Sequence, residues 1–156
     1  MKKTVFLSFL PLFFFVFTAC GGRNTGARPV LEIRENMFIT QLNAIHRNYR
    51  RYLGATIRME GMFHHNRWQG RDIYRVIRFV PGCCGERLEV GIEVTWDPNY
   101  PQSNQFNNDV QFPRPNDWVE AVGELRSHGV PGFPFLYIAL TELNILDRRG
   151  AEFVWR

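Results

Sequence analysis

Two adjacent cysteines, Cys83 and Cys84, are the residues of this sequence best suited to chemistry, and they lie in the run Pro81-Gly-Cys-Cys-Gly85. Neighbouring Cα atoms are about 3.8 Å apart, below the roughly 4.4 Å of a relaxed disulfide, so a bond between the two would be strained and easily reduced. As thiolates, both could bind one soft metal ion, although structural zinc normally takes four ligands. The pair alone is therefore half of a metal site.

Three interpretations of this pair are open. In the first, one cysteine faces the core as a small apolar residue and the other occupies a tight turn between the flanking glycines. In the second, Cys83 and Cys84 bind or transfer a thiophilic metal ion, zinc or copper. In the third, they carry out thiol–disulfide chemistry.

The third cysteine, Cys20, ends an apolar N-terminal segment and indicates where the protein resides. Lys2-Lys3 precede an apolar stretch from Val5 to Phe17, an order typical of a secretory signal. The residues Phe17-Thr18-Ala19-Cys20 resemble the lipobox of bacterial lipoproteins, in which the cysteine becomes the acylated N-terminus. The alternative is an ordinary cleaved signal with an incidental cysteine. We expect lipidation at Cys20 and a membrane-anchored protein of the cell envelope that faces the periplasm or the exterior.

The rest of the chain is expected to form a tether and one domain. Residues 21–33 begin with a Gly-rich polar run typical of a flexible tether, and residues 34–156 are assigned to the OB-like domain. Apolar residues that could belong to the folded part begin near Leu31. About 125 residues can bury a core without disulfides, and Cys83 and Cys84 alone imply no disulfide framework.

Charge argues against nucleic acid as a partner. Of the 19 basic residues, Lys2 and Lys3 lie in the signal, which leaves 17 arginines against 15 acidic residues, a formal balance of +2. The arginines are scattered, Arg58, Arg78 and Arg87 among them, and solvated strand faces and helix ends are their expected places. The small cluster Arg47, Arg50 and Arg51 could contact anionic lipid headgroups close to the anchor.

Periodicity predicts one helix followed by five strands. Helical spacing covers residues 38–49, with Phe38, Leu42 and Ile45 on one face. Alternation then predicts a strand in which Ile57, Met59 and Phe63 share a face. The predicted strands that follow are Ile73–Val80, Leu88–Trp96, Trp118–Arg126 and Phe135–Leu146, and Phe153–Trp155 is a predicted edge segment. The predicted connections are a turn at His64–Gly70, a long excursion at Asp97–Asn116 and a turn at Gly129–Gly132.

Five short strands joined by turns and preceded by a helix predict a mainly β protein, a small five-stranded OB-like barrel with an N-terminal helix. A two-sheet sandwich is the rival architecture. The excursion at Asp97–Asn116 is either a functional loop or a loose insertion.

Strand order decides which residues could complete a metal site. The His64-His65 turn and the Cys83-Cys84 turn lie at opposite ends of one predicted hairpin, about 26 Å apart across eight residues, so these histidines are poor co-ligands. His128, in the last turn, falls at the cysteine end in the usual OB strand order, and Glu86 is near in sequence. The predicted metal set is therefore Cys83, Cys84 and His128, although a surface role is the simpler expectation for His128 and Glu86.

A series of short motifs, in order and spacing, resembles the C-terminal soluble domain of the YcgQ-type family of proposed membrane permease subunits. The motifs are Tyr52-Leu-Gly54, Thr56–Gly61, Val76-Ile-Arg78, Cys83-Cys84, Gly91-Ile92 and Trp118–Gly123. The resemblance implies an OB-like domain, a permease partner in the membrane and a link to metal homeostasis. Family members carry transmembrane helices before this domain, where this chain has a lipoprotein signal and tether.

No catalytic motif is recognisable in the sequence: there is no Gly-rich phosphate loop, His-Glu-x-x-His helix or Gly-x-Ser-x-Gly elbow, and we do not expect an enzyme. Glu89 and Glu93 share a strand face that is expected to be solvated. The sequence thus favours a lipid-anchored extracytoplasmic accessory or binding module that binds a thiophilic metal ion for a membrane permease. A thiol–disulfide active envelope protein and a purely structural lipoprotein are the alternatives.

Overall fold

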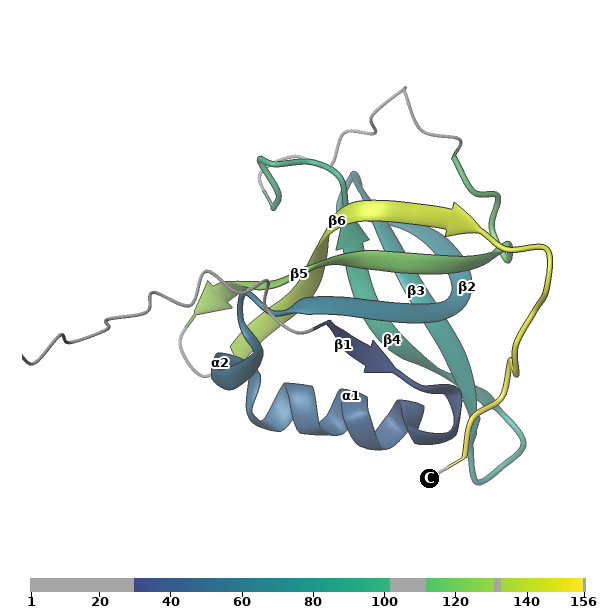
Figure 1. The fold of residues 1–156 in the computed structure, drawn as a ribbon. Helices are drawn as coiled ribbons and strands as arrows, with labels where there is room; N and C mark the ends of the chain where they lie inside the picture. Colours follow the sequence, from purple (N-terminus) through teal and green to yellow (C-terminus); the bar gives the residue numbers. More distant parts are fainter. Residues whose placement is uncertain (1–29, 102–111, 131–132, 156) are drawn as a thin grey trace, which may run out of the picture.

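The computed structural model describes residues 30–101, 112–130 and 133–155. Its elements are β1 (Leu31–Ile33), the 3-10 helix η1 (Glu35–Met37), α1 (Phe38–Arg47), α2 (Tyr49–Tyr52), β2 (Thr56–Trp68), β3 (Arg71–Pro81), β4 (Arg87–Thr95), β5 (Trp118–Val130) and β6 (Phe133–Ile145) (Figure 1). The predicted signal, the lipidation residue Cys20 and most of the predicted tether lie outside the described residues. Within them, no helix is long and apolar enough to cross a membrane.

Strands β2 to β6 close into a five-stranded barrel. The pairs β2–β3, β3–β4 and β5–β6 are antiparallel, β4 and β6 run parallel, and β5 returns to pair antiparallel with β2. Since β2 is bonded to β3 on one side and to β5 on the other, the sheet has no gap that would split it into two. The predicted OB-like barrel is confirmed, and the two-sheet sandwich is wrong.

Strand β2 serves both partners because it bends at its middle. Its first half, up to Met62, pairs with β5, and its second half, from Met62 onward, pairs with β3. Gly61 stands at the crossover, where an added Cβ would lie 2.7 Å from the carbonyl oxygen of Ile77. The close approach of β3 at this point therefore requires a residue without a side chain.

Helix α1 covers one end of the barrel (Figure 1). Phe38, Leu42 and Ile45 recur at helical spacing, and all three are buried in the main core. The helix therefore exists because its apolar stripe closes the barrel interior, which joins it to the core residues of the strands. Its predicted start is confirmed, and its end lies at Arg47, two residues before the predicted one.

The ordered chain begins earlier than the predicted domain boundary. Leu31–Ile33 form β1, which pairs in parallel with residues 57–59 of β2, and Ile33 is buried in the core. The prediction that the tether extends to residue 33 is therefore wrong at its end. Ile33 belongs to the domain because its side chain contributes to the same apolar cluster as α1.

Two predicted turns are strand instead. β2 continues through Trp68, and the turn to β3 consists of Gln69-Gly70, both with positive φ, as a tight two-residue hairpin requires. His64 and His65 are thus strand residues. Similarly, β5 continues to Val130, so His128 lies inside a strand, opposite Phe135. Cross-strand contacts such as that between His65 and Asp72 extend both hairpins beyond the apolar pattern.

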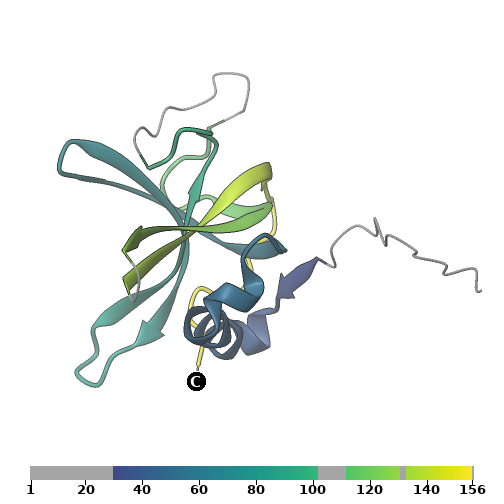
Figure 2. The ribbon, with the colours of Figure 1, turned by 90° about the vertical axis from the view of Figure 1, so that its left-hand side faces the viewer.

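The alternating strand β4 faces the core only along its second half. Ile92 and Val94 are buried, whereas Leu88 is 48% exposed. The first half of β4 pairs with the end of β3 in a hairpin that projects from the barrel (Figure 2). Figure 2 shows three such projections, formed by β2–β3, β3–β4 and β5–β6, which point in different directions.

One arginine is part of the core. Arg78 is 1% exposed, and its guanidinium carbon lies 5.1 Å from the ring centre of Phe38 and 4.9 Å from that of Trp118. It donates hydrogen bonds to the carbonyl oxygens of Glu60 and Ala151 and to the Glu35 carboxylate. The expectation that such arginines lie on solvated faces is wrong for Arg78, which joins the N-terminal segment, β2 and the C-terminal segment.

Candidate metal-binding hairpin loop

The cysteine pair lies at the tip of the β3–β4 hairpin. The loop Gly82–Glu86 is closed by a hydrogen bond from the Gly82 N–H to the Glu86 carbonyl oxygen, 2.8 Å. Gly85 adopts a φ of +85°, a conformation that L side chains rarely adopt. Below the loop, Phe79 packs against Phe153 of the C-terminal segment, with ring centres 5.7 Å apart. The stem is thus held by the rest of the domain, and the tip projects.

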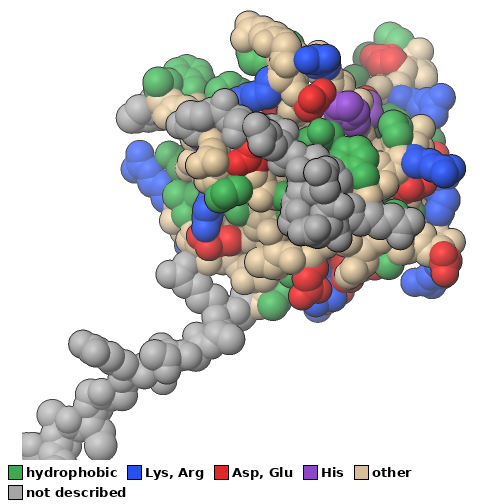
Figure 3. Space-filling model, turned by 90° about the horizontal axis from the view of Figure 1, so that it is seen from above, with side chains coloured by type: hydrophobic (Ala, Val, Ile, Leu, Met, Phe, Trp, Pro, Cys, Tyr) green, Lys and Arg blue, Asp and Glu red, His purple; other side chains and the backbone are tan. Residues whose placement is uncertain are grey.

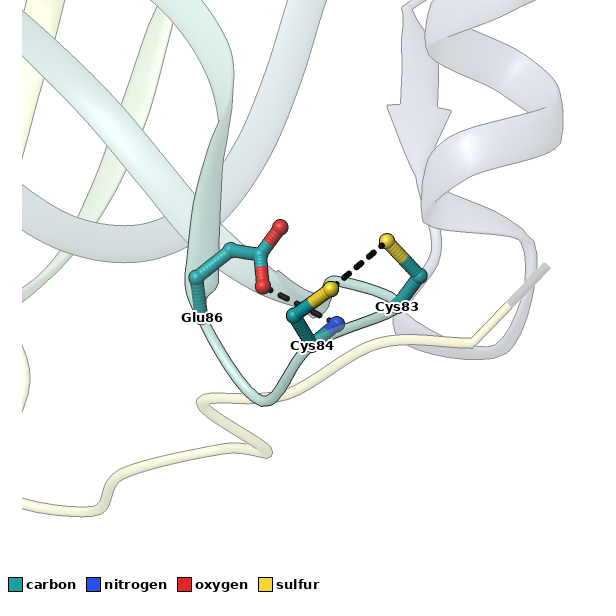
Figure 4. A group of neighbouring side chains, drawn as sticks. All are labelled: Cys83, Cys84 and Glu86. Carbon is teal, nitrogen blue, oxygen red and sulfur yellow. Dashed lines mark hydrogen bonds between the residues drawn. The ribbon is translucent and has the colours of Figure 1, made fainter.

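Cys83, Cys84 and Glu86 are gathered at this tip (Figure 4). The two sulfur atoms lie 3.5 Å apart, and the Cys84 N–H donates to Glu86 Oε2 at 3.0 Å. One sulfur from each cysteine and one carboxylate oxygen all lie within 4.8 Å of one another. The backbone hydrogen bond therefore orients the carboxylate toward the two sulfurs, and the loop presents three potential metal ligands on one side.

Both cysteines are free and exposed. The interpretation in which one of them faces the core is therefore wrong. Two zinc–sulfur bonds of about 2.3 Å at a tetrahedral angle would separate the sulfurs by about 3.8 Å, close to the 3.5 Å between Cys83 Sγ and Cys84 Sγ. The donor set of two thiols and one carboxylate fits zinc, and its soft sulfurs also fit copper. Glu86 is exposed, as expected of a surface residue, and its carboxylate lies beside the two sulfurs.

His64 and His65 do not join this group. His65 Nε2 lies 3.0 Å from Asp72 Oδ1, across the β2–β3 hairpin. His64 Nδ1 lies 3.3 Å from Glu89 Oε2, within ion-pair distance but outside hydrogen-bonding geometry. Glu89 also accepts a hydrogen bond from Arg75. Each histidine thus faces a carboxylate outside the group formed by Cys83, Cys84 and Glu86.

The structure does not bring His128 to the cysteines. Among the described residues, the group of metal-capable side chains at the loop consists of Cys83, Cys84 and Glu86. Figure 1 shows the β5–β6 hairpin and the β3–β4 loop on opposite sides of the barrel. Strand order alone put them at the same end, but twisted strands that extend beyond a barrel diverge.

His128 instead packs among aromatic rings. Its ring stacks on that of Phe135, with centres 5.3 Å apart and planes 15° apart, and the Tyr100 ring is equally close at an edge. Burial lowers the pKa of His128; Arg71 adds to this effect and the Glu93 carboxylate opposes it. Its Nε2 is buried without a hydrogen-bond partner among the described atoms. This environment favours the neutral ring and a packing role.

Tyr100 and its partners are a polar cluster that sequence periodicity missed. The Tyr100 hydroxyl donates to the Glu93 carboxylate, and burial, aided by this hydrogen bond, raises the pKa of Tyr100. Arg71 lies over the Tyr100 ring and donates to the Pro101 carbonyl oxygen at 2.7 Å. The start of the predicted excursion is thereby fixed to β3 and β4, and the Tyr100 ring also packs against Tyr137 of β6, with ring centres 4.7 Å apart. Glu93 is not a solvated strand residue as expected, because Tyr100 covers it.

The described surface carries charges of both signs. On the face seen in Figure 3, arginine and acidic side chains are interspersed among apolar ones. Two ion pairs illustrate the mixture, Arg58 with Glu120 and Arg126 with Glu124.

Comparison with known proteins adds little to these observations. No protein-family model matches the sequence, and no curated protein matches it either. Among solved structures, the dimeric N-terminal domain of the PriB protein from Thermoanaerobacter tencongensis is similar to this chain at 13% sequence identity and a TM-score of 0.32. The match covers 60% of this chain and 97% of the PriB domain. The assignment of an OB-like barrel therefore rests on the strand order and closure described above.

Proposed function

We propose that this protein is a lipid-anchored extracytoplasmic binding module that holds a thiophilic metal ion at Cys83, Cys84 and Glu86, as an accessory subunit of a membrane permease. The observation that carries the proposal is the convergence of two sulfurs and one carboxylate at an exposed hairpin tip. Zinc normally takes four ligands, so three protein donors leave a position for water or for a ligand from a partner. Such an open site suits uptake and transfer of the ion.

The anchoring part of the proposal rests on the sequence. Cys20 follows an apolar segment at the position where lipoprotein signals are cleaved and acylated. The permease partner rests on the motif resemblance to the YcgQ-type domains. The metal, the anchor and the partner are thus supported by three separate observations, and each can fail without the others.

Metal binding by the full chain, purified without oxygen, tests the central claim. We expect one equivalent of Zn²⁺ or Cu⁺ per chain, measured by metal analysis after removal of excess ion. Binding should be lost in Cys83→Ser and in Cys84→Ser and weakened in Glu86→Gln. Glu142→Gln, at an exposed carboxylate on β6, is the matched control and should bind as the parent does.

Two outcomes would count against the metal site. Stoichiometric binding that survives both cysteine substitutions would place the ion elsewhere. A chain that binds no metal but forms a reducible adduct with a small disulfide would favour the thiol–disulfide alternative, for which the 3.5 Å between sulfurs is the supporting observation. Intact-protein mass spectrometry of the same membrane fraction reports separately whether Cys20 carries acyl chains.

A further inference from the structure

An exposed apolar hairpin end lies beside an arginine cluster on one side of the barrel. At the end of the β5–β6 hairpin, Val130 is 65% exposed, Phe133 is 76% exposed and Phe135 is 61% exposed. Large apolar side chains with this exposure, gathered at one hairpin end, are a sign of an interaction surface. Arg47, Arg50 and Arg51, from the end of α1 and from α2, are exposed as well.

The two groups form one continuous surface. A hollow of about 220 Å³ is lined by Tyr49 and Arg50 on one side and by Gly129, Val130 and Pro134 on the other. Backbone hydrogen bonds join the same elements, because the Gly54 N–H donates to the Leu125 carbonyl oxygen at 2.8 Å. We call this surface the basic apolar face; it consists of Arg47, Arg50, Arg51, Val130, Phe133 and Phe135.

The two segments that carry the face contain basic residues and no acidic ones. Residues 38–53 contain no Asp or Glu, and neither do residues 125–141. Arg50 donates to the Tyr49 hydroxyl at 3.3 Å, which keeps its guanidinium beside an aromatic ring without neutralising its charge. Elsewhere on the described surface several arginines pair with carboxylates, among them Arg58 with Glu120 and Arg126 with Glu124. At the edge of the face, Glu93 lines a hollow together with Phe135.

We infer that the basic apolar face docks on an anionic bilayer surface, with the side chains of the hairpin end inserted among the lipids and the arginines at the headgroups. Apolar side chains flanked by basic ones are the pattern of interfacial membrane binding. Each arginine close to such a surface raises partitioning roughly fivefold. The inference extends the anchoring part of the proposed function and does not depend on the metal.

The position of the chain start agrees with this orientation at the α2 end of the face. β1 begins on the side of the barrel where α2 lies in both views, whereas Figure 2 shows the end of the β5–β6 hairpin on the other side of α2 (Figures 1 and 2). The nine residues between Cys20 and Val30 make ten Cα–Cα steps that span at most about 35 Å, so a lipid on Cys20 would hold the α2 side close to the membrane. The β3–β4 loop with Cys83 and Cys84 lies on the opposite side. Docking would therefore present the candidate metal site away from the lipid, toward soluble partners.

Hydrogen exchange of the full chain in nanodiscs tests the inference. We compare discs of phosphatidylcholine with 30% phosphatidylglycerol, discs of pure phosphatidylcholine, and the protein in detergent. We expect slower exchange in residues 129–136 in the anionic discs, by roughly tenfold or more if two arginines contribute. Phe133→Ser should remove this protection, and Arg50→Gln with Arg51→Gln should reduce it to the level of the neutral discs. Trp155→Ser is the matched control, because Trp155 is 75% exposed but lies outside the face.

Three results would overturn the inference. Equal exchange in anionic discs and in detergent would show that the face stays in water, even if mass spectrometry proves that Cys20 is acylated. Equal protection in neutral discs would remove the role of the arginines. Protection in detergent that increases with protein concentration would show that a second copy of the chain covers the face. Loss of acylation alone, with protection intact, would contradict the anchor and leave the docking surface in place.

Discussion

Arg78 and the cysteine pair occupy the same hairpin, yet they differ in solvent exposure and in the parts of the chain that they contact. Arg78 is 1% exposed, held between two aromatic rings and bonded to three acceptors from distant parts of the chain. Five residues later, Cys83 and Cys84 are exposed, and the contact between their sulfurs and the hydrogen bond to Glu86 both lie within the loop Gly82–Glu86. A buried charge with all its partners supports the fold, whereas reactive groups on a projecting tip are available to a ligand.

The stem of this hairpin stabilises the domain, whereas its tip carries the candidate ligand-binding residues. Its stem connects both ends of the described chain through Arg78 and Glu35. Its tip can change without disturbing that connection. Substitutions in the stem should therefore change stability, and substitutions at the tip should change binding.

Truncation of the buried arginine should have the largest effect. Arg78→Ala removes the guanidinium donor from two carbonyl oxygens and from the Glu35 carboxylate, so we expect the free energy of unfolding to fall by about 3–5 kcal/mol. Urea denaturation measures this change. Arg58→Ala removes an arginine whose side chain is 42% exposed, and it should change stability by less than about 1 kcal/mol. A similar loss of unfolding free energy in the two variants would contradict the role assigned to the buried Arg78.

The Arg78 contact should also appear in the acid dependence of stability. The hydrogen bond from Arg78, with one from the Ala151 N–H, lowers the pKa of Glu35 from its ordinary value of 4.5. Below 4.5 the unfolded chain then binds more protons than the folded one, so this contribution is lost as pH falls through the folded pKa. Glu35→Gln should flatten the pH dependence of urea unfolding in that window. Glu142→Gln, which replaces an exposed carboxylate, should retain the parent's slope; a parent-like slope in Glu35→Gln would contradict the assignment.

Gly82→Ala should weaken metal binding with little effect on stability. An added Cβ would lie 2.6 Å from the carboxyl carbon of Glu86, so that flexible side chain must move away from the sulfurs. We expect about tenfold weaker zinc binding, which corresponds to about 1.4 kcal/mol, measured by competition with a chelating dye. In a Glu86→Gln background the same substitution should add little. Additive losses would show that Gly82 acts on the loop by another route.

The smallest change in stability is expected at the cysteines themselves. Both are exposed, so Cys83→Ser and Cys84→Ser should each alter the free energy of unfolding by no more than about 0.5 kcal/mol in the presence of a chelator. Urea denaturation of the metal-free proteins measures it. A loss of more than about 2 kcal/mol would mean that the pair supports the fold.

Local patterns predicted most of the elements correctly. The helical spacing of Phe38, Leu42 and Ile45 and the alternation of Ile57 and Met59 both mark a face that the core buries. The turns were placed less well, because His64 and His128 look like loop residues in sequence but belong to strands that extend beyond the core. Hydrogen-bonded hairpin arms need no apolar alternation, so periodicity underestimates their length.

The candidate site was predicted in part. Cys83 and Cys84 were recognised from their types and spacing, and Glu86 was near in sequence, but its orientation depends on the hydrogen bond to the Cys84 N–H. The burial of Arg78 has a signal in the sequence, because Arg78 shares the alternation of Val76 and Val80, which are buried. The alternation along β3 predicts a buried side chain at position 78, whereas the charge of arginine predicts an exposed one. The aromatic rings and acceptors that resolve this conflict come from other elements.

The sequence by itself determined which segments form the helix and the five barrel strands, and that the cysteine pair lies between the second and third of these predicted strands, which are β3 and β4. These are local properties, since they depend on which residues along a short stretch are apolar. Closure of the barrel through β2 and β5, burial of Arg78 and separation of His128 from the cysteines were decided by the tertiary structure. Each depends on how twisted strands far apart in the chain cross and diverge, which is set by the packing of the whole barrel.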